Sequence, residues 1–442
     1  SNEYELIAQI YEPPLQYHFL RRPYELVPLV ANKVPEAVYL DEHRQVVAES
    51  DRRVRFSVYE ITIQPGIQFQ PHPAFAKTEK GEYTYHKLNA QDLESIHTIA
   101  DFTHTGTREL TADDYIYQIK RLAHPALNSP ILSIMNEYIV GMQAYAKSLD
   151  EAYKKIRAKH PGQQQVFLDL RQFDLKGVER VDRYTYRITI MGKYPQILYW
   201  MAMPFFAPIP VEADLFYAQE GMEEKNLNLH WYPVGTGPYM LTENNPNLRM
   251  ILAKNPNFHI EKYPNEGMPD DRQAGMLDDA GKALPFIDRV VFSLEKESIP
   301  YWNKFLQGYF DSSGVNSESF DQVIHMGSQG DLNLSDDMRK KGISLATTVQ
   351  ASTYYMGINM LDKTIGGYSE RARKLRQSIA IAVDYDEFIT IFLNGRGITA
   401  QGPLPPGIFG YQEGQNGVNP YVFDSVEAKP VRKSIDYARK LL

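Results

Sequence analysis

Five of the 11 histidines gather in one part of the chain, between residues 72 and 124. They are His72, His86, His97, His104 and His124. Imidazole is a common ligand of Zn²⁺, and two histidines on one helix reach the same ion when they lie four residues apart. No pair here has that spacing, and no Asp or Glu completes a recognisable motif with them. We therefore expect hydrogen-bonded or solvated histidines rather than a metal site, and no metal or other cofactor.

Other catalytic chemistry also lacks its usual sequence signals. The chain has no cysteine, which excludes disulfides, thiolate metal sites, iron–sulfur clusters and cysteine nucleophiles. It contains no Gly-x-Ser-x-Gly elbow, no His-Glu-x-x-His pair and no phosphate-binding P-loop. Its many carboxylates form no interpretable acid–base pair in the sequence. We therefore predict no catalytic residues and a protein that is not an enzyme. The alternative is an enzyme of an unrecognised type.

A proline- and glycine-rich stretch, residues 231–241, stands near the middle of the chain. Two prolines bracket Gly235 and Gly237, so the backbone either turns through conformations closed to other residues or lets another segment or a ligand pass very close. Pro238 favours an extended backbone before it, which predicts a strand from Tyr239 onward. We expect a rigid bend joined to a strand, as at a junction between domains. An ordinary tight turn is the alternative.

Length and composition limit the class of protein. The 442 residues are enough for two or three domains, and 43% hydrophobic with 23% charged residues is typical of a soluble globular protein. The net charge of -8 comes without a basic run, which argues against a nucleic-acid partner. The 30 tyrosines and 20 phenylalanines suit surfaces that hold ligands through ring faces, although large cores use aromatic residues as well.

No segment has the apolar length that a membrane-spanning helix needs. The nearest, residues 197–211, is short and is broken by three prolines. The sequence also starts without a signal peptide. Because Ser1-Asn2 is typical of the scar left by tag removal, we expect the natural start to have been removed.

The periodicity of apolar residues predicts the elements around these candidates. Thr111 is placed to cap a helix over residues 112–123, with acidic residues in its first turn. Residues 134–159 predict one long helix, and the alternation over 184–190 predicts a strand. A strand over residues 53–63 shows a one-residue change of phase, which predicts a bulge.

Residues 354–360 predict a strand with two unlike faces. One face is apolar, whereas Tyr355, Gly357 and Asn359 form a polar face with a gap at the glycine. A phenol and an amide beside such a gap would let the backbone of a ligand approach. An exposed edge strand would give the same pattern.

Several of these segments resemble the extracytoplasmic solute-binding proteins of ABC importers, and more narrowly family 5, the dipeptide, oligopeptide and nickel branch. The resemblance rests on Val-Gly-Thr-Gly-Pro-Tyr at 234–239, Lys-Asn-Pro-Asn at 254–257 and Ile-Tyr-Glu-Pro-Pro-Leu at 10–15. It is densest over residues 375–386 and the proline-rich 402–407. Capping and loop stiffening explain most of those last two segments, so we assign them to the scaffold.

The resemblance implies an α/β fold in two lobes, like the periplasmic binding proteins of type II (cluster C), with an accessory subdomain in the first lobe. The first lobe would comprise residues 1–40 and 166–270, the accessory subdomain 41–165, and the second lobe 271–442. Relatives continue past the segment that corresponds to this chain. We therefore expect the C-terminal part of the second lobe, and the return of the chain to the first lobe, to be missing here.

The resemblance also implies a receptor that captures a small ligand, above all a peptide, between two hinged lobes and delivers it to an ABC-type permease in the membrane. We expect export to the periplasm or the cell surface, and a monomer. Ring faces and backbone groups suit a peptide because they do not depend on its side chains. The candidate ligand-binding residues are Tyr11, Glu12, Trp231, Tyr232, Tyr355 and Asn359.

Two alternative functions remain compatible with this resemblance. The same fold could bind an oligosaccharide, a metal chelate or another non-peptide solute. A sensory or structural protein could also have kept the scaffold and lost transport.

Overall fold

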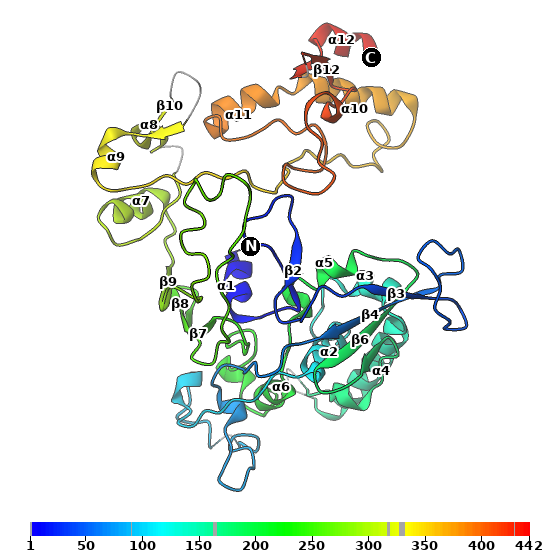
Figure 1. Ribbon diagram of the computed structural model, residues 1–442, viewed down its shortest axis with the longest axis vertical. Helices are drawn as coiled ribbons and strands as arrows, with labels where there is room; N and C mark the ends of the chain where they lie inside the picture. Colours follow the sequence, from blue (N-terminus) through cyan, green and yellow to red (C-terminus); the bar gives the residue numbers. More distant parts are fainter. Residues whose placement is uncertain (1, 90, 162–165, 316–318, 327–331, 428) are drawn as a thin grey trace. The chain divides into compact units, whose positions relative to one another are not determined.

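The structure is a computed structural model that describes residues 2–89, 91–161, 166–315, 319–326, 332–427 and 429–442 (Figure 1). The chain divides into two compact units. Unit 1 comprises residues 1–21 and 25–294, and unit 2 comprises residues 22–24 and 295–442. The three-part division expected from the sequence stays a prediction. Among the described residues, no helix combines the length and the apolarity that crossing a bilayer requires.

The largest sheet of unit 1 is antiparallel, with the strand order β3-β4-β6-β5 (Figure 1). Its strands are β3 (Ala37–Leu40), β4 (Phe56–Thr62), β5 (Val178–Arg180) and β6 (Thr185–Met191). The strand predicted over 184–190 is confirmed. The predicted bulge is wrong, because β4 and β6 pair residue for residue along their whole length. Tyr59 and Ile61 point into the core while Phe56 and Val58 lie on the half-covered opposite face, so both faces are apolar without a change of register.

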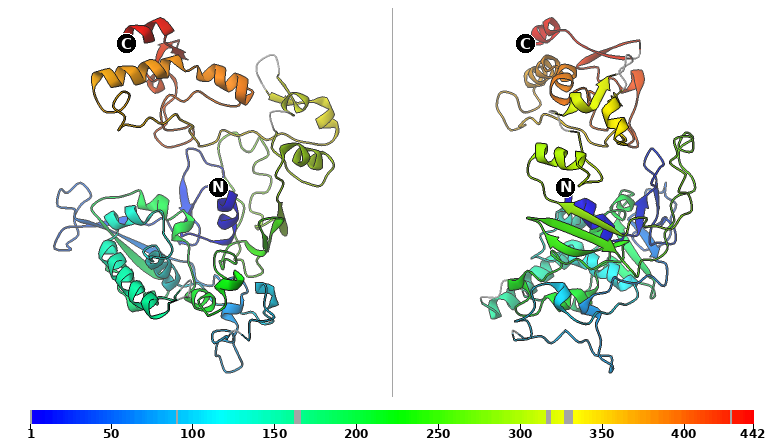
Figure 2. Two further views of the ribbon diagram at one scale, coloured as in Figure 1. Left: turned by 180° about the vertical axis from the view of Figure 1, so that it is seen from behind. Right: turned by 90° about the vertical axis from the view of Figure 1, so that its left-hand side faces the viewer.

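Three helices share the core of this sheet: α2 (Ala112–Arg121), α3 (Leu132–Tyr138) and α4 (Met142–Lys159) (Figures 1 and 2). Thr111 is the N-cap of α2, as predicted, and forms a capping box in which the Asp114 carboxylate accepts the backbone N–H of Thr111 at 2.9 Å. The single helix predicted over 134–159 is wrong. Gly141 has a φ of 80° and stands between α3 and α4, a left-handed conformation that glycine adopts without strain.

A second antiparallel sheet of unit 1 carries the N-terminal helix. Its strands are β7 (Tyr239–Asn245), β8 (Arg249–Lys254) and β9 (Arg289–Ser293), and the strand predicted from Tyr239 onward is thereby confirmed. Leu6 and Ile10 pack with Tyr239 and Leu252 in a small apolar cluster. Unit 1 also contains the α-helices α1 (Asn2–Ile10), α5 (Ile197–Trp200) and α6 (Val211–Tyr217), the hairpin β1 (Leu15–Tyr17) and β2 (Leu26–Pro28), and short 3-10 turns.

Unit 2 is built from helices and two antiparallel pairs of strands around small cores. One core gathers around Trp302 and Phe320, the other around Ile381 and Phe423. Its helices are α7 (Ser298–Leu306), α8 (Phe320–Val323), α9 (Asp336–Lys340), α10 (Glu370–Ala382), α11 (Tyr385–Leu393) and α12 (Ile435–Leu441). Its strands are β10 (Ile324–Met326), β11 (Leu332–Leu334), β12 (Phe423–Val426) and β13 (Lys429–Arg432).

The strand predicted over residues 354–360 is wrong. This segment belongs to no helix or strand, and no strand of the described residues pairs with it. Tyr354 and Tyr355, which would point to opposite faces of a strand, are 89% and 85% exposed. A strand needs a neighbour for its backbone hydrogen bonds, and alternation alone does not supply one.

Candidate functional site

The central bend and the N-terminal segment cross at close range in unit 1. The backbone N–H of Gly237 donates to the carbonyl oxygen of Ile10 at 2.8 Å. A Cβ added to Gly235 would lie 2.0 Å from the same oxygen, and one added to Gly237 would lie 2.6 Å from the carbonyl oxygen of Gln9. Neither glycine has a positive φ. Close approach of another segment, rather than a special turn conformation, is therefore the reason for both glycines.

Buried amide side chains fix this crossing. Gln70 holds both backbone groups of Gly235: its own backbone N–H donates to the Gly235 carbonyl at 2.9 Å, and its side-chain Oε1 accepts the Gly235 N–H at 3.1 Å. The Asn255 side chain donates to the carbonyl of Gly237 at 2.9 Å. Both amides are buried and all their bonds here are to backbone. The bend joined to a strand is confirmed, since β7 starts at Tyr239, but the expected place at a junction between domains is wrong, because residues 231–241 lie inside unit 1.

Glu12 lies directly after this crossing and is only 2% exposed. His259 Nε2 donates to its Oε1 at 2.7 Å, and the Tyr115 hydroxyl donates to its backbone carbonyl at 3.0 Å. Glu12 Oε2 has no hydrogen-bond partner within the described residues. The buried hydroxyl of Thr236 has none either, although it lies close enough to Glu12 to lower the pKa of the carboxyl group. The carboxylate is thus held by one nitrogen and keeps one unused oxygen.

Burial and pairing act in opposite directions on these groups. Burial raises the pKa of Glu12 above its ordinary value, and the hydrogen bond and charge of His259 only partly oppose it. Burial alone would lower the pKa of His259, but its hydrogen bond to Glu12 and the nearby carboxylates raise it overall. Burial also raises the pKa of the half-buried Tyr11 to about 12, so its phenol stays neutral at physiological pH. Tyr11 and Glu12 both lie against the interior of unit 1, and their contact with a ligand stays a prediction.

A buried hydrogen-bond chain supports the residues that precede the bend. The Tyr217 hydroxyl donates to the carbonyl of Tyr232 at 2.9 Å and lies 2.8 Å from Nε2 of His72. Because that hydroxyl has one proton to give, His72 must donate from Nε2, and its Nδ1 accepts the N–H of Ala74 at 3.1 Å. Burial lowers the pKa of His72 to about 3. This neutral histidine is structural, which confirms the expectation of hydrogen-bonded histidines at this position.

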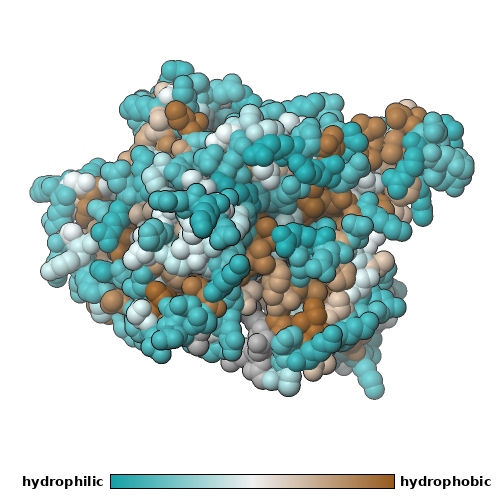
Figure 3. All heavy atoms as spheres, turned by 90° about the horizontal axis from the view of Figure 1, so that it is seen from below, coloured by the Kyte–Doolittle hydropathy of each residue, from teal (hydrophilic) through white to brown (hydrophobic). Residues whose placement is uncertain are grey.

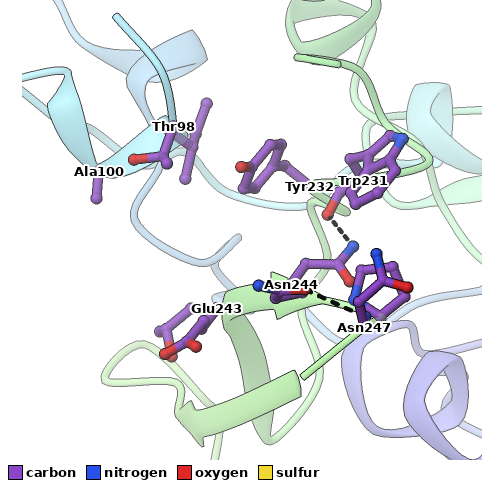
Figure 4. Close-up of a pocket in the computed structure, with 11 residues that line it drawn as sticks. Thr98, Ala100, Trp231, Tyr232, Glu243, Asn244 and Asn247 are labelled. Carbon is purple, nitrogen blue, oxygen red and sulfur yellow. Dashed lines mark hydrogen bonds between the residues drawn. The ribbon is translucent and has the colours of Figure 1, made fainter. Parts of the chain in front are cut away.

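Trp231 and Tyr232 line a pocket of about 390 Å³ in unit 1 (Figure 4). The side chain of Asn244 donates to the backbone carbonyl of Trp231 at 2.9 Å, which ties the backbone of Trp231 to strand β7. Tyr11 and Glu12 are not among the residues that line this pocket. The other lining residues are Thr98, Ile99, Ala100, Thr242, Glu243, Asn244, Asn245, Pro246 and Asn247.

The remaining two candidates, Tyr355 and Asn359, belong to unit 2. Tyr355 is exposed, while the side-chain oxygen of Asn359 accepts the N–H of Leu361 at 3.0 Å and closes a local turn. Their role in ligand binding stays a prediction.

An aromatic surface of unit 1 was missed by sequence reasoning. Tyr17 stacks with Tyr199 at 6.5 Å between ring centroids, and Phe19 meets Tyr263, which in turn stacks with Phe286. Phe19, Tyr199 and Phe286 are 66%, 46% and 48% exposed. We call Tyr17, Phe19, Tyr199, Tyr263 and Phe286 the aromatic face. Large exposed rings that touch one another are typical of binding surfaces.

The sequence offered only a weak signal for the aromatic face. Tyr17 and Phe19 follow the segment at 10–15, but nothing in the chain indicates that Tyr199, Tyr263 and Phe286 converge on them. The rest of the surface is more ordinary. On the side shown in Figure 3, hydrophilic side chains predominate and hydrophobic ones form separate patches.

Comparison with known protein families identifies the family of this chain. Residues 103–442 match the model of the bacterial extracellular solute-binding proteins, family 5 (middle region). The chain belongs to this family. Among curated proteins, this family 5 chain is 23% identical over 355 residues to heme-binding protein A of Haemophilus influenzae, covering 80% of this chain and 51% of that protein. It is 26% identical over 231 residues to the periplasmic oligopeptide-binding protein OppA of Salmonella typhimurium, covering 52% of this chain and 36% of OppA.

Solved structures confirm the fold class. The murein tripeptide binding protein MppA of Escherichia coli superposes with a TM-score of 0.53 at 15% sequence identity, covering 95% of this chain and 58% of MppA. The family 5 chain thus has the α/β fold of the two-lobed periplasmic binding proteins, as predicted. It spans about half of heme-binding protein A and about a third of OppA.

Proposed function

We propose that this chain is the ligand-capturing part of a receptor that takes up a peptide and delivers it to an ABC-type permease in the membrane. The observation that carries the proposal is the family match over residues 103–442. The names of OppA and MppA, an oligopeptide- and a tripeptide-binding protein, support a peptide as the ligand. In this proposal the receptor works as a monomer outside the cytoplasm, in the periplasm or at the cell surface, and releases the peptide chemically unchanged.

The aromatic face supports a peptide ligand by its chemistry. A receptor for peptides of varied sequence needs contacts that do not depend on any one side chain, and exposed rings provide apolar area with hydrogen-bonding edges. We assign the first contacts to Phe19, Tyr199 and Phe286. The sequence-predicted residues Tyr355 and Asn359 would add a phenol and an amide from unit 2.

Thermal unfolding of the chain against a panel of peptides of two to eight residues tests this function. A ligand that binds only the native state raises the unfolding temperature as its concentration rises, by about 2.7 kcal/mol of stability at a hundred times Kd. We expect such a rise for at least one peptide and its loss in the double variant F19A/Y199A. The variant Y309A, which removes a ring that is 73% exposed in unit 2, is the matched control. A flat response to every peptide would refute the proposal.

A second candidate ligand is an intact iron porphyrin. The heme-binding relative from Haemophilus influenzae and the stacked Tyr17–Tyr199 pair favour it, because parallel rings offer a flat surface to a planar macrocycle. The described residues contain no group of three side chains able to hold a bare metal ion, so the chelate would bind as a whole. Titration with hemin tests this candidate. A saturable change of the porphyrin absorbance that is absent in Y199A would make heme, rather than a peptide, the ligand of this chain.

A further inference from the structure

The pocket of Figure 4, which we call the Trp231 pocket, has two different walls. Trp231, Asn244 and Asn247 gather on one side, and Thr98 and Ala100 lie on the other (Figure 4). Its volume of about 390 Å³ falls within the range of sites for small molecules. It combines an indole and a phenol with three asparagine side chains, a composition that the peptide proposal does not use.

The wall of the Trp231 pocket carries no unpaired charge. Glu243 is the charged residue that lines it, and both of its carboxylate oxygens are occupied by Arg249, whose Nε and Nη2 donate at 2.8 Å and 3.1 Å. The other lining side chains are amides, hydroxyls, rings or aliphatic groups. A neutral wall favours a neutral ligand, because an ion would lose its hydration without gaining a partner.

Neutral donors and acceptors stay available on that wall. Asn244 uses its Nδ2 on the Trp231 carbonyl, which leaves its Oδ1 as an acceptor. Asn245 uses its Oδ1 on the N–H of Asn247 at 3.1 Å, which leaves its Nδ2 as a donor. Three more groups have no hydrogen-bond partner among the described residues: the side-chain amide of Asn247, the indole N–H of Trp231 and the hydroxyl of Tyr232. The lining residues therefore offer both donors and acceptors beside aromatic rings.

The wall is also held in place before any ligand arrives. Asn228 Oδ1 accepts the N–H of Trp231 at 2.9 Å, and Tyr217 holds the carbonyl of Tyr232. The turn that carries Asn245 and Asn247 is closed by its own side chain. Preorganised groups lose less conformational entropy on binding, which matters most for a weakly held neutral ligand.

We propose that the Trp231 pocket binds a pyranose unit of a saccharide, at a site separate from the peptide-binding surface. A pyranose presents an apolar C–H face, which packs on the Trp231 indole, and a rim of hydroxyls, each able to donate and to accept a hydrogen bond. The amides of Asn244, Asn245 and Asn247 match that rim. The inference does not rest on the proposed function, because the pocket lies within unit 1 and needs no peptide.

Nuclear magnetic resonance of the indole N–H groups tests the saccharide site on the full chain. The chain has three tryptophans, and the variant W231F identifies the signal of Trp231. Maltotriose and N,N′-diacetylchitobiose are the probes. We expect at least one of them to shift the Trp231 signal in a saturable manner, and N247A to weaken that binding at least tenfold. The variant N32A, at an exposed asparagine outside the pocket, should leave it unchanged.

Two results would overturn the proposal. One is a Trp231 signal that neither saccharide moves at millimolar concentrations, while circular dichroism shows the protein folded. The other is a Trp231 signal that moves with a bound peptide and not with a saccharide, which would assign the pocket to the peptide. Because peptide binding is measured separately by thermal unfolding, failure of the saccharide site and failure of the peptide receptor are distinguishable.

Discussion

His259 Nε2 lies 2.7 Å from Glu12 Oε1, at a carboxylate that is almost completely buried. The bond joins the segment that follows α1 to the segment that follows β8, two stretches that are 247 residues apart in the sequence. Since Ile10, two residues before Glu12, sits against the glycines of the bend, this pair holds the N-terminal segment where it crosses the centre of the chain.

The Glu12–His259 pair makes stability fall as the pH rises. The pKa values of both groups are raised in the folded protein, so the folded state binds their protons more tightly than the unfolded state. Their contribution is complete below the unfolded pKa values and is lost as the pH rises through the folded ones. As the pH rises above the ordinary values of 4.5 for Glu12 and 6.5 for His259, we expect the unfolding temperature of the wild type to fall relative to that of E12Q/H259Q. Parallel pH profiles of the two proteins, measured by differential scanning calorimetry, would contradict this assignment.

His72 titrates with the opposite sign. Its pKa of about 3 lies below the ordinary value of 6.5, so its contribution to stability is present above pH 6.5 and is lost as the pH falls toward the folded value. We expect H72Q to lose about 1–3 kcal/mol at pH 7, because Tyr217 and Ala74 lose a buried partner. Urea unfolding between neutral and acidic pH measures both effects. The control H43Q changes an exposed histidine and should cost at most about 0.5 kcal/mol; equal losses in the two variants would refute the role of His72.

Side chains at the two glycines of the bend should disrupt the crossing. We expect Gly235→Ala to cost more than about 3 kcal/mol, since its Cβ meets the backbone oxygen of Ile10 rather than a flexible side chain. Gly402→Ala is the matched control, because a Cβ at that position meets nothing within 4 Å and should change stability by less than about 0.5 kcal/mol. Chemical unfolding of both variants checks the prediction, and a Gly235→Ala protein as stable as Gly402→Ala would show that the segments do not cross here.

Arg108 should be essential to the core of unit 1. Its guanidinium Nη2 lies 2.6 Å from both Asp114 Oδ1 and Glu212 Oε2. Removal of this arginine leaves two carboxylates buried without a counter-charge, so we expect R108M to cost about 3–5 kcal/mol. The exposed Arg187–Glu60 pair provides the control, and R187M should cost at most about 1 kcal/mol.

Neutralising Asp114 and Glu212 shows how much of the destabilisation in R108M comes from unpaired buried charge and how much comes from lost packing. The triple variant R108M/D114N/E212Q should recover much of the stability that R108M loses, because no buried charge is left alone. Urea unfolding of R108M, R187M and the triple variant measures the three costs. Equal losses in R108M and R187M would mean that the buried network contributes no more than a surface ion pair.

Local sequence signals predicted the parts of the fold that local physics controls. The cap of α2 and the alternation along strand β6 depend on neighbouring residues, and the sequence indicated both of them. The strand predicted over 354–360 was wrong because the alternation of its side chains does not reveal that no strand of the described residues lies beside it. The break at Gly141 was missed because a single glycine within a helical pattern is normally tolerated.

The candidate site shows the same limit of sequence reasoning. Glu12 was singled out, but its partner His259 is hundreds of residues away and carries no motif that would connect the two. The aromatic face brings together rings from three distant parts of the chain. Composition can count such rings, but only tertiary structure shows which of them touch.

In the proposed function, this chain captures a peptide and releases it unchanged. Native mass spectrometry of the chain, incubated with an equimolar mixture of tetrapeptides, tests this claim most directly. We predict one bound peptide per chain, with the mass of an unmodified tetrapeptide both on the protein and after release, and loss of that complex in F19A/Y199A/F286A. Absence of any bound peptide, or release of cleaved or otherwise altered peptides, would contradict the account.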